Sequence, residues 1–163
     1  MPLMLSGSCR CGSVGFQVQS HTPYPYQRCY CSICRKAGAG SGYAVNIMGR
    51  AETLEVRGKN GIETFQAMIT DQGEPRLGSC QRSFCRDCGT MLWVFDEQWP
   101  DLLHPFASCI DTDLPGPPEL VHIMLDFKAP WIEPQIGPTD QSYARYPAQS
   151  IEDWHRSRGL WVD

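Results

Sequence analysis

The sequence lacks any long hydrophobic run, because no stretch of its 163 residues approaches the roughly 20 consecutive apolar residues that a membrane-spanning helix requires. Residues 1–9 also lack the positive and apolar segments of a secretion signal, so we expect a cytoplasmic protein. Positive charge is scarce as well: 14 lysines and arginines face 18 acidic residues, and the net charge is −4. Without a basic stripe, nucleic acid and anionic membrane are not expected as partners.

Cysteine, by contrast, is abundant, with nine in the chain. Seven of them fall in three short clusters in which one or two residues separate neighbouring cysteines. Such spacings are typical of zinc ligands, since a tight turn can aim two thiolates at one metal ion. A reducing cytoplasm also favours metal ligation over disulfide formation. The clusters are Cys9 and Cys11, then Cys29, Cys31 and Cys34, then Cys85 and Cys88.

Seven thiolates divide most simply into a site of four and a site of three. Structural zinc is closed by four protein ligands, whereas a catalytic site with three keeps a position for water or substrate. Cys11 and Cys88 are each followed by glycine, which easily takes the positive φ that bends a backbone around a metal, but Cys34 is not. We therefore predict a structural site and a catalytic site, formed respectively by Cys9, Cys11, Cys85 and Cys88 and by Cys29, Cys31 and Cys34.

A second way of dividing the seven cysteines also gives a site of four and a site of three, and the sequence alone does not exclude it. It would group Cys9, Cys11, Cys29 and Cys31 against Cys34, Cys85 and Cys88.

Between the cysteines the apolar pattern is that of short strands. Val14, Phe16 and Val18 alternate with polar residues, which is the period of a half-buried strand. Glycine-containing links over 37–42 and 71–75 indicate loops. The predicted fold is mainly β, with antiparallel sheets held together by zinc. Strands are predicted over 13–19, 43–48, 53–57, 62–69, 77–84, 90–95, 102–110 and 119–127.

The composition, with 42% hydrophobic and 20% charged residues, is that of a globular protein large enough for one core. After Trp131 the sequence becomes rich in Pro, Gln, Tyr and Asp with little periodicity. We predict a zinc-binding domain over residues 1–133 and a C-terminal extension over 134–163 that packs on it. In this extension Ser150 and Asp153 cap one short helix over 151–158, which Gly159 ends.

Several motifs occur in a characteristic order along the chain. As a set they resemble the family of glutathione-dependent formaldehyde-activating enzymes, which also contains centromere protein V, over roughly residues 5–133. The motifs are Cys9-x-Cys11-Gly12, Cys29-x-Cys31-Ser32-x-Cys34-Arg35, Arg82-Ser83-Phe84-Cys85-x-x-Cys88-Gly89-Thr90, His122-Ile123 and Lys128-Ala129-Pro130-Trp131.

The resemblance implies a tent-like, all-β fold with two zinc ions per chain, one structural and one catalytic. It assigns the structural zinc to Cys9, Cys11, Cys85 and Cys88, and the catalytic zinc to Cys29, Cys31 and Cys34. It also implies the addition of glutathione, or another thiol, to formaldehyde or a related small aldehyde. The product would be S-(hydroxymethyl)glutathione, and the reverse direction defines a carbon–sulfur lyase. Cys80 and Cys109 match no position of the family.

A zinc ion held by three thiolates has a formal charge of −1, so it is a weaker Lewis acid than zinc held by three neutral histidines. A soft thiol suits its fourth position, and the thiolate is the nucleophilic form. We therefore expect a glutathione thiolate to attack the aldehyde there. Tyr30, Ser32 and Arg35 lie on the same turn and are candidates to hydrogen-bond the developing alkoxide or a glutathione carboxylate.

Two other interpretations compete with this one. In the first, the protein is a non-catalytic, zinc-stabilised binding module in which a histidine closes the three-cysteine site. In the second, Cys80 or Cys109 performs thiol redox chemistry and the metal is purely structural. The histidines available for the first interpretation are His21, His104, His122 and His155.

Overall fold

The computed structural model describes residues 1–38, 40–70 and 73–163. Within the two predicted loops over 37–42 and 71–75, Ala39, Asp71 and Gln72 lie outside the described residues. The described part of the chain is mainly β, as the sequence predicts, and its strands form three sheets.

The first sheet is antiparallel and contains the N-terminal strands in the order β1-β2-β6. Leu5 of β1 and Val18 of β2 are register partners and are fully buried, while Met4 and Gln19 next to them point the other way. This alternation buries one face of the hairpin. The strands are β1 (Leu3–Ser8), β2 (Gly15–Ser20) and β6 (Glu55–Arg57).

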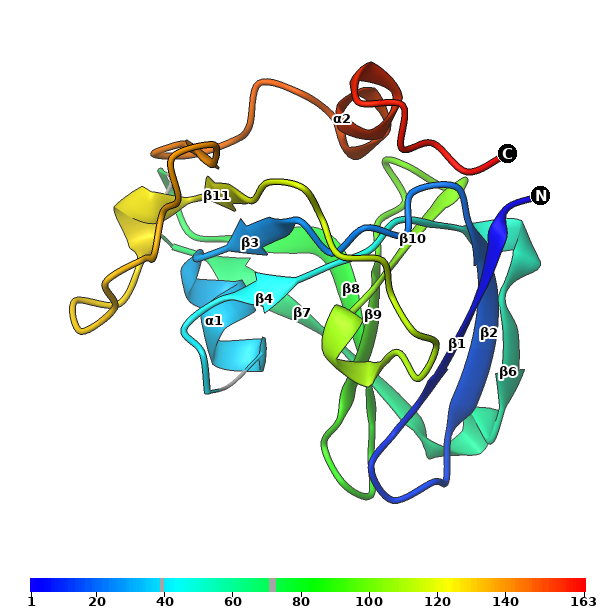
Figure 1. Ribbon diagram of the computed structural model, residues 1–163. Coiled ribbons are helices and arrows are strands. Elements are labelled where there is room, and N and C mark those ends of the chain that lie inside the picture. The colour runs from blue at the N-terminus through cyan, green and yellow to red at the C-terminus, as the bar shows by residue number, and fades with distance from the viewer. Residues whose placement is uncertain (39, 71–72) are drawn as a thin grey trace.

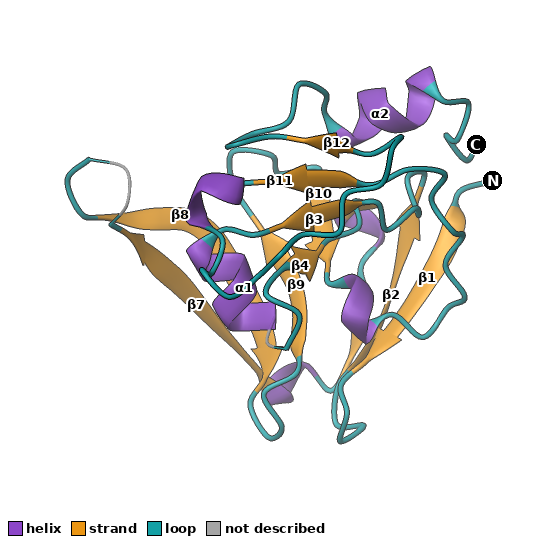
Figure 2. Ribbon diagram, turned by 60° about the vertical axis from the view of Figure 1, so that its left-hand side comes forward, coloured by secondary structure: helices purple, strands orange, loops and turns teal. Residues whose placement is uncertain are grey.

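The second sheet is also antiparallel and has the order β5-β10-β9-β8-β7. Its longest hairpin, β7 with β8, projects away from the rest of the sheet (Figure 2). Register shifts occur in β7 between Gln66 and Met68 and in β8 between Ser83 and Phe84. The strands are β5 (Gly49–Arg50), β7 (Ile62–Ile69), β8 (Arg76–Cys85), β9 (Met91–Phe95) and β10 (Leu102–Pro105).

The third sheet is mixed, with the order β12-β11-β3-β4. β11 pairs in parallel with both β3 and β12, and only β3 with β4 is antiparallel. The sheet therefore joins the start of the three-cysteine cluster, at Cys29, to the segment around His122 and to the C-terminal region. The strands are β3 (Gln27–Cys29), β4 (Ala44–Val45), β11 (Val121–Ile123) and β12 (Gln141–Ser142).

The three sheets are arranged like a tent. The β1–β2 hairpin and the β7–β8–β9 strands slope toward each other and converge at their loops, and the mixed sheet crosses the wide end (Figure 2). Helix α1 (Ser32–Gly38) lies beside the mixed sheet, and α2 (Ile151–Ser157) lies above β11, near the C-terminus (Figure 1). The short 3-10 turns are η1 (Ala51–Thr53), η2 (Lys59–Gly61), η3 (Ala107–Cys109) and η4 (Leu125–Phe127).

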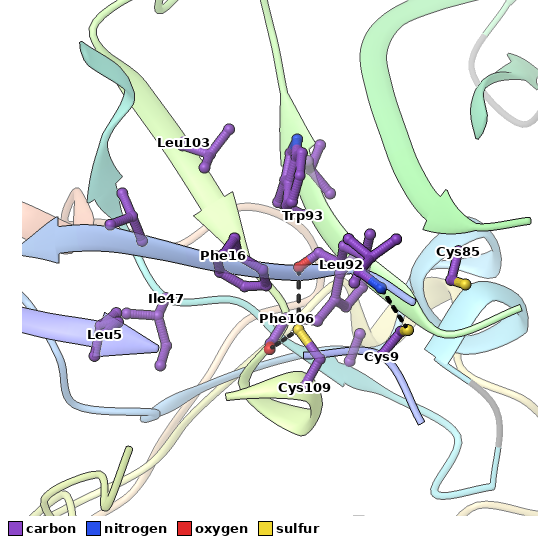
Figure 3. Close-up of a cluster of buried hydrophobic side chains, with 14 of the residues drawn as sticks. Leu5, Cys9, Phe16, Ile47, Cys85, Leu92, Trp93, Leu103, Phe106 and Cys109 are labelled. Carbon is purple, nitrogen blue, oxygen red and sulfur yellow. Dashed lines mark hydrogen bonds between the residues drawn. The ribbon is translucent and has the colours of Figure 1, made fainter. Parts of the chain in front are cut away.

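The main core fills the space between the two sloping sheets. Phe16 packs edge-on against Trp93, with ring centroids 5.2 Å apart, and Leu5, Ile47 and Leu92 complete the interior (Figure 3). A second cluster lies between the mixed sheet and α2 and is centred on Trp154 and Tyr26, whose rings stack at 3.6 Å. Burial of these side chains is the main contribution to the stability of the fold.

Most predicted strands are present, but several are shorter. The prediction for 62–69 matches β7, while 13–19, 77–84 and 90–95 match β2, β8 and β9 to within two residues. Strands predicted over 102–110 and 119–127 each end early in a 3-10 turn. In the second case Met124 takes a positive φ of 61°, which an extended strand cannot continue. The strand predicted over 43–48 shortens to β4, and that over 53–57 begins within η1.

The C-terminal helix agrees with its predicted limits to one residue. Ser150 accepts a hydrogen bond from the backbone N–H of Asp153, which is the predicted cap, and Gly159 takes a φ of 65° beyond the end. A second helix, α1, was not predicted: it begins inside the second cysteine cluster and extends to Gly38, within the predicted loop over 37–42. The division at 133 and 134 stays a prediction.

Candidate metal centres

The first cysteine group lies where the two sloping sheets converge. Cys9 and Cys11 come from the β1–β2 loop, and Cys85 and Cys88 from the end of β8 and its turn into β9. Their four sulfur atoms lie within 4.8 Å of one another, although about 75 residues separate the two pairs in sequence. Gly12 and Gly89 adopt φ values of 81° and 72°, so each cysteine pair is followed by the bend that the sequence predicts.

Several hydrogen bonds fix these two loops against each other. The backbone N–H of Val14 donates to Cys9 Sγ at 3.2 Å, and that of Arg10 donates across to Thr90 Oγ1 at 3.1 Å. The same Thr90 side chain, 3.2 Å from Cys88 Sγ, is the main reason that the pKa of Cys88 falls to about 6. A low pKa favours the thiolate, which is the form that binds metal.

The second cysteine group lies at the wide end of the tent, where β3 leads into α1. Cys29 ends β3, Cys34 is a buried residue of α1, and Cys31 lies between them, with the three sulfurs within 4.8 Å of one another. The N–H of Cys34 donates to Cys31 Sγ at 3.3 Å. Hydrogen bonds from Cys29, then Cys34, then the backbone lower the pKa of Cys31 to about 2, so this sulfur is the most easily kept as a thiolate.

The spacing of the sulfurs fits tetrahedral zinc in the four-cysteine group, and the three sulfurs of the other group lie within 4.8 Å of one another. With Zn–S bonds of about 2.3 Å, tetrahedral ligands lie about 3.8 Å apart. In the four-cysteine group Cys11 Sγ is 3.5 Å from Cys9 Sγ and 3.7 Å from Cys85 Sγ. Among the described residues neither group includes a histidine or a carboxylate. Both groups could therefore hold zinc, and they match the first partition of the seven cysteines rather than the second.

A chain of polar side chains, from Tyr30 through His122 to Asp140, connects the three-cysteine group to β11. Tyr30, between Cys29 and Cys31, is 1% exposed, and its hydroxyl lies 3.0 Å from Nδ1 of the fully buried His122. On the other side of the imidazole, Nε2 faces Asp140 Oδ2 at 3.6 Å. The N–H of Tyr30 also donates to the carbonyl of Ile123. The turn that carries the cysteines is thus tied to β11 at two points.

Two cavities are lined in part by Ile33, which lies between Cys31 and Cys34 in the sequence. The first, of about 610 Å³, lies between α1 and β7 and is mostly apolar, with Lys36 and Ser32 at its α1 side and Phe65 and Met68 at its β7 side. The second, of about 460 Å³, runs along β8 and is more polar. Its lining includes Ile33, Cys80, Arg82 and Asp96. Both volumes suit a small ligand.

The other candidate residues have different environments. Tyr30 is bonded to His122, and Arg35 Nε donates to the carbonyl of Phe127 at 3.3 Å, so both hold the turn rather than face a cavity. Ser32 lines the α1–β7 cavity, where it could contact a bound ligand. His21 Nδ1 donates to the carbonyl of Val162 at 2.6 Å, and His155 Nδ1 donates to the carbonyl of Ile151 at 2.7 Å.

A scan against protein-family models matches residues 4–125 to the glutathione-dependent formaldehyde-activating enzyme model. The chain belongs to this family. A Halomonas elongata protein, provisionally named a glutathione-dependent formaldehyde-activating enzyme, is 50% identical over 158 residues, which cover 97% of this chain and 98% of the relative. The crystal structure of a Rhodobacter sphaeroides protein, 24% identical, superposes with a TM-score of 0.51 and covers 68% of this chain and 91% of its own. This last likeness concerns the fold alone.

In this member of the glutathione-dependent formaldehyde-activating family, the two remaining cysteines, Cys80 and Cys109, belong to neither sulfur group. Cys109 points into the core and donates to the carbonyls of Leu92 and Phe106 (Figure 3). Cys80 donates to Asp96 Oδ2 at 3.1 Å, and burial raises its pKa to about 11, with Asp96 adding to the effect. Both thiols are therefore held protonated, which does not favour the interpretation that they perform redox chemistry.

The sequence analysis did not identify Arg82 as a candidate site residue. Arg82 belongs to the motif that ends in Cys85 and Cys88, yet its side chain contacts Cys34 of the other group. The two residues are 48 positions apart, in strand β8 and helix α1. No helix in the described part of the chain has the length and apolar character needed to span a bilayer.

Proposed function

We propose that this protein joins glutathione to formaldehyde, giving S-(hydroxymethyl)glutathione, at the site formed by Cys29, Cys31 and Cys34. The observation that carries the proposal is that these three sulfurs lie within 4.8 Å of one another and that, among the described residues, their group contains no further cysteine, histidine or carboxylate. Ile33, between Cys31 and Cys34, also lines two cavities that could hold the substrates. Family membership and the name of the Halomonas relative support glutathione and formaldehyde as the substrates.

The four-cysteine group would have a structural role. Cys9, Cys11, Cys85 and Cys88 provide a complete set of ligands at the point where two sheets meet, and a closed site of this kind stabilises a fold rather than binding a substrate. Two zinc ions per chain are therefore proposed, one in each group.

In the three-cysteine site, zinc when bound would supply a position that a soft thiol occupies as its thiolate. In the reaction, the sulfur of glutathione forms a bond to the aldehyde carbon while the π bond of the carbonyl breaks. The electron pair passes to oxygen, and the proton lost by the thiol is regained there. Formaldehyde needs little activation, so holding the two reactants together accounts for much of the rate.

The residues around the cysteines would orient the substrates. Ile33, Phe65 and Met68 give the α1–β7 cavity an apolar wall, and Lys36 at its edge suits a carboxylate of glutathione. The tie between Tyr30 and His122 keeps Cys29 and Cys31 in place. Breakdown of the adduct is the same reaction in reverse and makes the protein a carbon–sulfur lyase. A reaction on free thiols suits the reducing cytoplasm.

Native mass spectrometry of protein purified without chelator tests the proposal. We expect two zinc ions per chain and one glutathione retained at millimolar concentration, and the loss of glutathione binding in the Cys31→Ser variant. Cys109→Ser is the matched control, because Cys109 lies outside both sulfur groups and lines neither of the two cavities. Formation of S-(hydroxymethyl)glutathione is then followed by NMR. Two zinc ions without any bound thiol would instead favour a non-catalytic, zinc-stabilised module.

A further inference from the structure

Arg82 is a buried cation in contact with the three-cysteine site. It is 6% exposed, and its Nη2 donates to Cys34 Sγ at 3.8 Å. Its other terminal nitrogen, Nη1, is buried and has no hydrogen-bond partner among the described residues. A buried donor without a partner is rare in a folded protein and indicates either strain or a ligand that completes it.

The guanidinium also lacks a carboxylate partner in the described part of the chain. Asp96, the buried acid that lines the same cavity, already accepts hydrogen bonds from Ser79, Cys80 and the backbone of Gln98. An arginine cannot lose its proton in a protein, and burying its charge without a counter-charge is costly. The negative charge that balances Arg82 must therefore come from the cysteines or from a ligand.

The charges of the loaded site would balance. Zinc with three thiolates carries −1, and Arg82 adds +1 beside Cys34, so the buried group is neutral overall. The four-cysteine group differs in that Cys11 and Cys88 are exposed, so that water can solvate its charge. Arg86, which lies between Cys85 and Cys88 of that group, is also largely exposed. A buried arginine thus accompanies only the group whose charge is shielded from water.

We propose that Arg82 is the charge partner of the three-cysteine site and that its free Nη1 donates to the anionic atom of the ligand bound beside Cys34. The first part concerns the protein alone. The second rests on the proposed function, and it assigns a thiolate sulfur or an alkoxide oxygen to the cavity along β8, which Arg82 lines.

The test compares Arg82→Met, which removes the charge, with Arg82→Lys, which keeps it. Arg86→Met is the matched control at an exposed arginine. The first measurement is the rate at which a chelator removes zinc, with alkylation and peptide mass spectrometry identifying the cysteines that lose it. We expect Arg82→Met to lose zinc from Cys29, Cys31 and Cys34 at least about tenfold faster, while Arg82→Lys and Arg86→Met stay close to the wild type.

The second measurement is binding of glutathione and of S-methylglutathione, which has no thiol to ionise. Arg82→Met should weaken glutathione binding by roughly tenfold and leave S-methylglutathione unchanged. Wild-type zinc retention and wild-type glutathione affinity in Arg82→Met would overturn the inference. If that variant does not fold, Arg82→Gln replaces it, and equal zinc loss from Arg82→Gln and Arg82→Lys would overturn it as well.

The two proposals fail in different ways. If wild-type protein binds no glutathione, the proposed function is wrong, and the chelator measurement alone then decides whether Arg82 balances the charge of the three-cysteine site.

Discussion

The hydroxyl of Tyr30 and Nδ1 of His122 lie 3.0 Å apart in the interior, and neither side chain is more than 1% exposed. Burial lowers the pKa of His122, so the ring is neutral and can accept the phenolic proton at Nδ1 while Nε2 carries its own proton toward Asp140. Asp140 also accepts the backbone N–H groups of Leu120 and Gly137. The position of Cys29 and Cys31 thus depends on residues more than 90 positions away.

Removing the Tyr30 hydroxyl should therefore weaken both the fold and the site. Tyr30→Phe leaves Nδ1 of His122 buried without a donor, which we expect to lower the free energy of unfolding by about 1–3 kcal/mol. Chemical denaturation measures this loss, and Tyr146→Phe, at a side chain that is 70% exposed, is the control. Equal stability of the two variants would show that the hydrogen bond contributes nothing.

The two cysteine groups should respond differently to mutation. Cys88→Ser breaks the link between the two sloping sheets, so we expect loss of one zinc ion and a fall in Tm on the order of 10 °C. Cys31→Ser should also lose one zinc ion but keep the tent intact, because the sheets still converge on the other group. Native mass spectrometry and circular dichroism measure the two effects, and indistinguishable melting curves would contradict the division of roles.

Helix α2 should stabilise the three-cysteine site from the far side of the mixed sheet. Trp154 is 1% exposed and stacks on Tyr26, and Cys29 and Cys31 pack against the same cluster. We expect Trp154→Ala to lower the free energy of unfolding by about 3–5 kcal/mol and to speed hydrogen exchange in β3 and β11. Trp131→Ala is the control, since that side chain is 70% exposed. Unchanged exchange in both strands would contradict this role.

The sequence predicts the β content and the grouping of the cysteines because both depend on local features. Alternation of apolar residues marks β2, and the glycines after Cys11 and Cys88 mark the two bends that the structure contains. The parallel pairing of β11 with β3 is not predictable in this way, since strands of three residues carry too little pattern to specify a partner.

Helix α1 and Arg82 escaped prediction for physical reasons as well. The helix has seven residues and lacks an acidic residue in its first turn, and it begins between two cysteines whose spacing alone suggests a turn. The contact of Arg82 with Cys34 joins strand β8 to helix α1 across 48 positions of the sequence. Contacts of this kind follow from tertiary packing, and no local propensity encodes them.

The stability of the protein should depend on pH through His104. Burial lowers the pKa of this side chain to about 4, although the Asp96 carboxylate opposes the shift. In the unfolded chain its pKa is about 6.5, so below that pH the unfolded state binds a proton that the native state does not. The contribution of neutral His104 is complete above about pH 6.5 and is lost progressively as the pH falls to about 4.

This prediction is best tested as a difference, because acid also removes zinc from thiolates. His104→Asn cannot titrate, so the stability advantage of the wild type over this variant should shrink by at most about 3 kcal/mol between pH 7 and pH 4. Urea denaturation of both proteins at each pH, at a fixed zinc concentration, measures the difference while the loss of metal affects them alike. A difference that stays constant over this range would mean that His104 is as easily protonated in the native state as in the unfolded chain.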